Sequence, residues 1–102
     1  MKIVLIREKD KNAVIAIAKA SIKEKIHIWA YGSRVNGDAH DTSDLDLVIK
    51  TVDNTKLNIS EFLTFKENLR ESNIPIIVQV MDWHRISDTF HKQILKKYSV
   101  FV

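Results

Sequence analysis

The sequence predicts a small α/β domain in which helices flank a three- to four-stranded mixed sheet. Two patterns carry this prediction. Apolar residues recur at every third or fourth position in some segments, as in amphipathic helices, and alternate or run together in others, as in strands. The chain has 102 residues but only two glycines and one proline, which favours regular structure with short connections. One core is feasible at this length, so we expect a single domain over residues 1–102.

The predicted elements follow the order helix, strand, strand, helix, strand, helix. Their expected ranges are 10–25, 26–31, 45–49, 58–71, 76–81 and 87–98. Residues 2–6 are either a short strand or an extended arm, and they would make a fourth strand if they pair with the sheet.

The first helix and the first strand are predicted from different periodicities of their apolar residues. Val14, Ile17 and Ala18 recur with lysines between them, and Asp10 can cap the start of this helix. Residues 26–31 alternate and are rich in residues that favour strands, and Gly32 ends this strand. The following residues have loop composition, with one helical turn opened by Ser33.

The second half of the chain repeats the pattern. Asn58 and Glu61 stand at the two positions of a capping box, so they mark a helix start. Pro75 separates this helix from an apolar strand. The second helix is expected to bury Ile59, Phe62, Leu63 and Leu69, and the last helix to face the core with Phe90, Ile94 and Tyr98. We expect the apolar residues 98–102 to pack on the domain rather than to form an interface.

Composition excludes several classes of protein. Hydrophobic residues make up 45% and charged residues 28%, which is typical of a globular chain and not of a disordered one. The absence of cysteine excludes a disulfide scaffold, a thiolate zinc site and a cysteine nucleophile. A membrane span needs about 20 apolar residues, and the sequence has no such run. We therefore expect a cytoplasmic protein with no membrane partner. The net charge of +3 suits an anionic ligand but is poor evidence for nucleic acid.

One segment combines residues suited to phosphate and to metal. Gly32 permits a tight turn with open backbone N–H groups, and Ser33 can cap a short helix beside it. Asp44 and Asp46 lie two positions apart on a strand, so both carboxylates project from one face. A hard divalent cation such as Mg²⁺ would hold the two carboxylates together, and its other positions would take water and phosphate oxygens. This is what an enzyme acting on a nucleoside triphosphate needs.

The same segment resembles a known family. The stretch from Trp29 to Gly37, followed by Ser43-Asp44-Leu45-Asp46-Leu47, is similar to the signature of the minimal nucleotidyltransferases, small members of the DNA polymerase beta-like nucleotidyltransferase superfamily. The resemblance covers nearly the whole chain. It implies the small nucleotidyltransferase fold and an antitoxin of a two-gene pair. The implied partner is an all-helical HEPN-domain toxin, neutralised by binding, by transfer of AMP from ATP to a toxin tyrosine, or by both.

The resemblance also implies roles for individual residues. Gly32 and Ser33 would hold the triphosphate, and Arg34 would steady the turn or a phosphate. Asp44 and Asp46 would be the catalytic carboxylates that bind Mg²⁺.

The sequence departs from the family at one position. The third carboxylate is expected about three residues before the Asp-Trp pair, where this chain has Gln79. A neutral amide cannot serve as a general base and is a weak metal ligand. Asp82 would face the opposite side of a regular strand, because it is an odd number of residues from Gln79. Asp38, Asp41 and Asp53 are loop residues with little prospect of reaching the metal.

Three functions therefore remain open from the sequence. The first is a minimal nucleotidyltransferase that binds MgATP and modifies a hydroxyl of its helical partner. The second is an antitoxin with impaired catalysis that acts by binding only. The third is a transferase acting on a small molecule or on RNA, for which 102 residues leave little room for substrate recognition.

Overall fold

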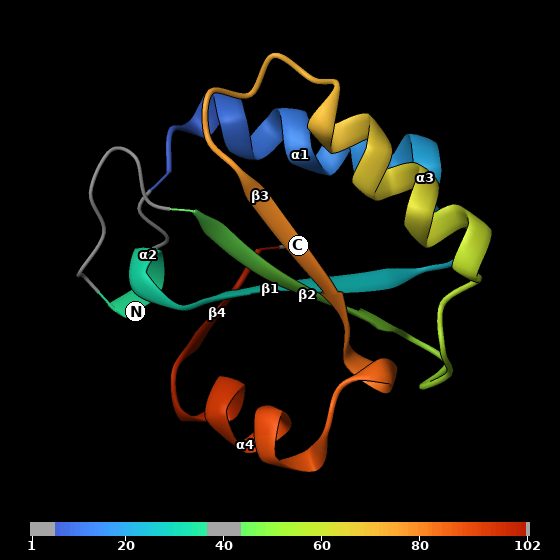
Figure 1. The fold of residues 1–102 in the computed structure, drawn as a ribbon, viewed down its shortest axis with the longest axis vertical. Coiled ribbons are helices and arrows are strands. Elements are labelled where there is room, and N and C mark those ends of the chain that lie inside the picture. Colours follow the sequence, from blue (N-terminus) through green and yellow to red (C-terminus); the bar gives the residue numbers. More distant parts are fainter. Residues whose placement is uncertain (1–5, 37–43, 102) are drawn as a thin grey trace.

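The computed structural model describes residues 6–36 and 44–101, which form a four-stranded mixed sheet with helices on both faces (Figure 1). The strand order is β3-β2-β1-β4. The expected fold class is confirmed. The elements are α1 (Glu8–Ser21), β1 (Ile26–Tyr31), α2 (Ser33–Asn36), β2 (Leu45–Thr51), α3 (Ile59–Arg70), β3 (Val78–Asp82), the 3₁₀ turn η1 (Trp83–Arg85), α4 (Asp88–Lys96) and β4 (Tyr98–Val100).

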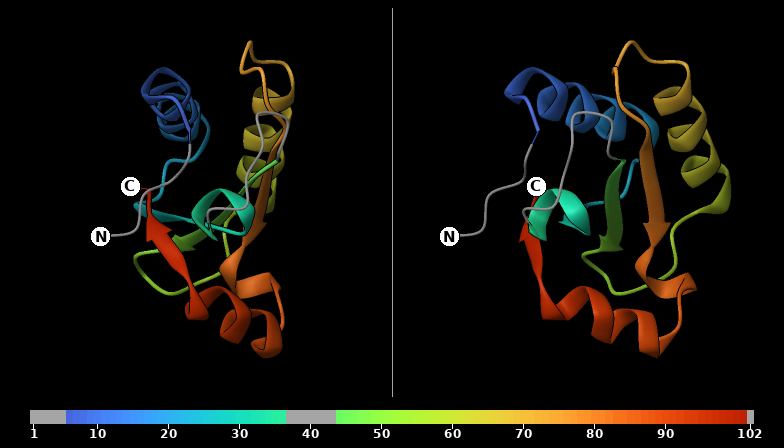
Figure 2. Two further views of the ribbon diagram at one scale, coloured as in Figure 1. Left: turned by 90° about the vertical axis from the view of Figure 1, so that its left-hand side faces the viewer. Right: turned by 60° about the vertical axis from the view of Figure 1, so that its left-hand side comes forward.

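The sheet is built around the antiparallel pair of β1 and β2. Strand β4 adds to the other side of β1 in antiparallel orientation, and β3 adds to β2 in parallel orientation. Strands β3 and β4 are therefore the two edges, as the turned views in Figure 2 show. The parallel pairing needs a crossover connection, which α3 provides.

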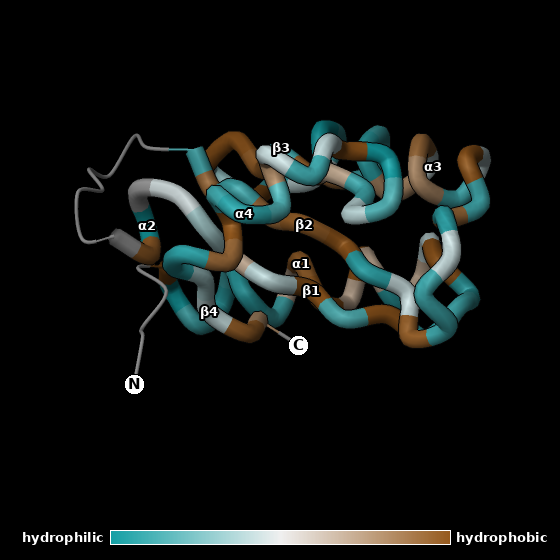
Figure 3. The backbone as a smooth tube through the Cα atoms, turned by 90° about the horizontal axis from the view of Figure 1, so that it is seen from below, coloured by the Kyte–Doolittle hydropathy of each residue, from teal (hydrophilic) through white to brown (hydrophobic). Residues whose placement is uncertain are grey.

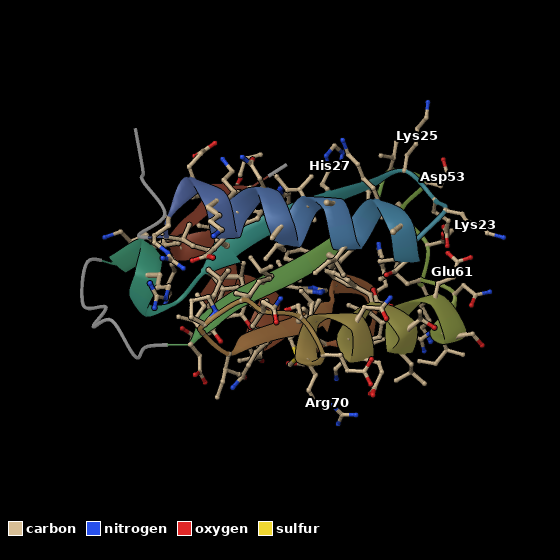
Figure 4. All side chains as sticks on the ribbon, turned by 90° about the horizontal axis from the view of Figure 1, so that it is seen from above. Lys23, Lys25, His27, Asp53, Glu61 and Arg70 are labelled. Carbon is tan, nitrogen blue, oxygen red and sulfur yellow. The ribbon has the colours of Figure 1, made fainter. Side chains whose placement is uncertain are left out.

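Helices α1 and α3 lie side by side over one face of the sheet (Figures 1 and 4), and α4 lies on the other face (Figure 1). The main core lies between the sheet and the helix pair. It is formed by residues with almost no exposure, including Val14 of α1, Ile28 of β1, Leu47 of β2, Phe65 of α3 and Val80 of β3. Seen from the α4 side, Figure 3 shows the apolar β2 running through the middle of the molecule.

The first helix begins and ends earlier than expected. Arg7 occupies the N-cap position, and Asp10 does not cap the helix: its carboxylate accepts a 2.8 Å hydrogen bond from Arg7 Nε. At the other end, Ser21 Oγ donates to the Ile17 carbonyl, and Ile22 is already extended. Residues 22–25 instead connect α1 to β1. None of the helices in the described ranges has the length and apolarity to cross a membrane.

The predicted start of α3 is confirmed, but two of the four residues that we expected this helix to bury are exposed. Asn58 accepts a hydrogen bond from the Glu61 N–H, as an N-cap should. The Glu61 carboxylate accepts from the Lys23 N–H, so it ties α3 to the end of α1. Ile59 and Leu63 are 48% and 55% exposed. The helix is turned so that Phe65 takes the buried position between Phe62 and Leu69.

The C-terminal segment corrects two expectations. The last helix, capped by Ser87, ends at Lys96 and does not reach Tyr98. Residues 98–100 form β4, so the fourth strand comes from the C-terminus. Residues 2–5 lie outside the described ranges. The expected packing of the C-terminal tail is confirmed, since Phe101 is buried against the main core.

Strand β3 begins at Val78, two residues later than expected.

Candidate nucleotide- and metal-binding site

The candidate site lies at the start of β2, on the sheet face opposite α1 and α3. Leu45 and Leu47 are fully buried against those helices. Because side chains alternate along a strand, Asp46 projects from the opposite face, as Asp44 does at the residue before β2. The spacing of the two aspartates thus places two carboxylates together at one end of the sheet.

Gly32 forms the wall of the site that faces Asp46. It has a φ of +82°, a conformation that side chains disfavour. A Cβ at this position would come within 2.5 Å of Asp46 Oδ2. The Gly32 carbonyl accepts a 3.0 Å bond from the Val35 N–H, which closes the turn into α2. Glycine is therefore required here both by the turn and by the close approach of the carboxylate.

Gln79, on the neighbouring strand β3, lies beside the two aspartates. It lies opposite Asp46 in the parallel register of β2 and β3. Its Nε2 donates a 2.8 Å hydrogen bond to Asp44 Oδ2. The position predicted for a third carboxylate is thus at the site, and an amide occupies it.

Asp82 lies on the other face of β3, as its odd spacing from Gln79 predicted. Its side chain is fully buried and accepts hydrogen bonds from the Leu57 N–H, the His84 N–H and Arg85 Nε. Arg85 also donates to the Leu57 carbonyl. Asp82 therefore anchors the segment before α3 and does not substitute for the missing carboxylate. Asp53 is exposed beyond the far end of β2, at the opposite end of the strand from Asp44 (Figure 4).

The surroundings of Asp46 make its negative charge unfavourable. Burial and, second, the charge of Asp44 raise the pKa of the Asp46 carboxyl. Burial and the nearby Asp46 raise the pKa of Tyr31 to about 12, so this phenol stays protonated at physiological pH. The Tyr31 ring packs edge-on against Phe90 of α4, which fits strand packing rather than stacking on a nucleobase.

These residues fit a divalent cation. Two converging carboxylates repel each other, and an oxygen-preferring cation would relieve that repulsion. Within the described ranges no cluster of three or more His, Cys, Asp or Glu side chains could hold a metal. Among the residues that the structure describes, Asp44 and Asp46 would be the carboxylate ligands, with the Gln79 amide beside them. This donor set suits Mg²⁺ that keeps waters and shares phosphate oxygens.

Two further predicted residues lie in α2. The helix begins at Ser33, whose backbone is described and whose side chain is not. Arg34 is 7% exposed, so its side chain is covered by the domain. Residues 37–43, which include the loop residues Asp38, His40 and Asp41, lie outside the described ranges.

The sequence did not predict an aromatic cluster that lies on the same face of the sheet as the candidate site. Trp29 of β1 contacts Trp83 edge-on, with ring centroids 5.3 Å apart, and lies 4.7 Å from Tyr98 of β4. The His91 ring of α4 stacks on the Trp83 ring, with centroids 3.9 Å apart. The aromatic character of these residues was visible in the sequence, but the pairing of β4 with β1 that joins them was not.

Comparisons with known proteins identify the family of this chain. Residues 12–102 match the family model described as polymerase beta, nucleotidyltransferase. The chain is 36% identical over 93 residues to a probable protein adenylyltransferase, MntA, of Haemophilus influenzae. The aligned residues cover 88% of this chain and 80% of that protein.

Solved structures show the same fold. A toxin–antitoxin crystal structure with AMP-PNP superimposes with a TM-score of 0.72 at 22% identity, over 90% of this chain and 72% of that one. A crystal structure from Shewanella oneidensis gives a TM-score of 0.71 at 14% identity, over 95% of this chain and 72% of that one. A mutant MntA–HpeT toxin–antitoxin structure gives a TM-score of 0.72 at 17% sequence identity, over 90% of this chain and 72% of that one. The resemblance seen in the sequence is confirmed, and the chain belongs to the polymerase beta nucleotidyltransferase family.

Proposed function

We propose that this protein is the antitoxin of a toxin–antitoxin pair that binds MgATP at Asp44, Asp46 and the Gly32 turn and transfers AMP to a hydroxyl of its partner. The single observation that carries the proposal is the pair of carboxylates packed against a glycine turn in which no side chain would fit. The protein adenylyltransferase name of the Haemophilus influenzae relative supports the reaction. The partner proposed from the sequence resemblance is a helical HEPN-domain protein.

The chemistry divides between the bound metal and the protein. In the reaction a hydroxyl oxygen forms a bond to the α-phosphorus of ATP, and the bond from that phosphorus to the bridging oxygen breaks to release pyrophosphate. The hydroxyl proton passes to solvent water. Mg²⁺ would neutralise phosphate charge and orient the triphosphate. Asp44 and Asp46 would hold the metal, and Gly32 lets the Asp46 carboxylate lie directly against the turn that would bind the triphosphate, with Ser33 and Arg34 beside it. The Gln79 amide cannot take the hydroxyl proton.

Gln79 supports a second candidate function, in which the protein neutralises its partner by binding alone. An amide bonded to Asp44 stands at the position predicted for the third carboxylate, and an amide cannot accept the proton. Loss of a general base costs about 10²–10⁴-fold in rate. The two functions predict the same complex but different covalent products.

Intact mass spectrometry of the partner separates these functions. The helical protein encoded beside this gene is incubated with this protein, ATP and Mg²⁺, and the complex is followed by size exclusion. A mass gain of one or more AMP groups that Asp46→Asn abolishes supports the transferase. Asp53→Asn is the matched control, because Asp53 is exposed at the far end of β2. A stable complex without mass gain supports binding alone, and absence of a complex contradicts both.

A further inference from the structure

An open groove of about 740 Å³ runs between α3 and β3. Leu63, 55% exposed, lies on its helix side, and Ile77, 67% exposed, on its strand side. Ile74 and Pro75 of the connecting segment also line it, so much of the lining is apolar. Figure 4 shows Arg70, which also lines the groove, projecting from the outer side of α3, away from α1.

The groove follows the open edge of β3. Val78 and Val80 face the helix side of the sheet, and Gln79 and Met81 face the other side. All four line the groove, which is possible only along the edge of the strand. Within the described ranges β3 pairs with β2 alone. The edge therefore presents backbone donors and acceptors that an added strand can use.

The register shows which backbone groups are available. The Leu45 N–H donates to the Ile77 carbonyl at 2.9 Å, so that carbonyl points toward β2. Since backbone groups alternate along a parallel ladder, the N–H and C=O of Val78 and Val80 point away from β2, toward the groove.

The chemistry of the lining selects the class of ligand. Tracking a nucleic-acid backbone needs a row of cations. The lining here has two cations, Lys66 and Arg70, of which Arg70 pairs with Glu67, and the other walls are largely apolar. A polypeptide satisfies both features, because its backbone pairs with the edge and alternate side chains enter the apolar wall.

The groove reaches the candidate site. Gln79 lines the groove and bonds Asp44. A strand added to β3 would lie about 4.8 Å away, and its residue opposite Gln79 would project toward the same face as Asp46. Resting on the proposed function, we propose that β3 binds an extended segment of the partner protein as a fifth strand, which presents the acceptor hydroxyl beside Gln79.

Two substitutions on one helix test the apolar wall. Leu63→Asp places a charge in the groove, whereas Ile59→Asp places it one turn earlier on α3, outside the groove lining. Both side chains are about half exposed, so both variants should fold. Leu63→Asp should weaken the complex with the partner by about tenfold or more, while Ile59→Asp leaves it unchanged. Equal affinities for the two variants would overturn the proposal.

A second pair of variants tests strand addition itself. Val78→Pro removes an N–H that faces the groove, and Val78→Ala removes most of the side chain but keeps that N–H. Only Val78→Pro should lose affinity. In the wild-type complex, the Val78 and Val80 amides should gain protection from hydrogen exchange. Protection confined to other elements would place the partner elsewhere on the domain.

The tests separate this proposal from the proposed function. Binding of ATP with Mg²⁺ should be the same in Leu63→Asp as in wild type by calorimetry. If the wild type neither binds nor modifies the partner, the proposed function fails. If it does both and Leu63→Asp is equally competent, only the groove proposal fails. Transfer of AMP to total cellular RNA in place of the partner would overturn the polypeptide ligand.

Discussion

The side-chain amide of Gln79 donates a 2.8 Å hydrogen bond to the carboxylate of Asp44, across the junction of β2 and β3. The two residues are far apart in the sequence, and the parallel register of the strands brings them together. In this arrangement a neutral donor stands where the family resemblance predicts a negative ligand. The bond explains how the site accommodates two carboxylates, since the amide stabilises one of them.

Replacing Gln79 by aspartate should make the protein depend on the metal. Gln79→Asp adds a third carboxylate beside Asp44 and Asp46, so the melting temperature should fall without divalent ions and rise more than that of wild type when Mg²⁺ is added. Transfer of AMP should increase, by up to about 10²–10⁴-fold if only the base is missing.

Gln79→Asn is the control for the previous prediction, because it matches aspartate in size but carries no charge. It should show the Mg²⁺ response of the wild type in thermal unfolding. An equal response in Gln79→Asp and Gln79→Asn would mean that position 79 does not contact the metal.

Gly32→Ala should damage both stability and nucleotide binding. The left-handed conformation at φ +82° costs a non-glycine residue about 1–3 kcal/mol, and the new methyl would press on Asp46 Oδ2. Urea unfolding and ATP calorimetry measure the two effects. Asn54, the other left-handed residue in the described ranges with φ 62°, provides the control Asn54→Gly, which should change stability by less than about 1 kcal/mol. Wild-type ATP affinity in Gly32→Ala would exclude the turn from the site.

The stability of the metal-free protein should depend on pH through Asp46. Its raised pKa means that folding favours the protonated carboxyl. This contribution is fully present below the ordinary value of 3.8 and is lost as pH rises through the raised pKa. Asp46→Asn should therefore melt at a higher temperature than wild type at neutral pH, and the two should converge below about pH 4. The same difference at every pH would contradict the assignment.

Asp82→Ala should destabilise the fold without altering the site. The variant leaves the Leu57 N–H without its buried acceptor and removes the ion-pair partner of Arg85. The expected loss is about 3 kcal/mol in the free energy of unfolding, with ATP affinity unchanged at temperatures where the variant is folded. Asp88→Ala is the control, because that side chain is 99% exposed. Lost ATP affinity in folded Asp82→Ala would assign Asp82 to the site.

The sequence determined the features that depend on neighbours along the chain. The period of apolar residues located the three long helices, and Asn58 marked the start of α3 through a bond to Glu61, three residues away. The spacing of Asp44 and Asp46 and the odd separation of Gln79 and Asp82 assigned side chains to faces, because alternation in a strand is local geometry. The family resemblance rested on the same short stretch.

Tertiary structure decided which segments meet. The pairing of β4 with β1 turned the end of an expected helix into a strand, because residues 98–100 gain ladder hydrogen bonds that no local signal encodes. The rotation of α3 buried Phe65 and exposed Leu63, since a helix with apolar residues on several sides is oriented by its neighbours. The bond from Gln79 to Asp44 and the groove along β3 likewise depend on strand order, which long-range packing sets and local periodicity does not.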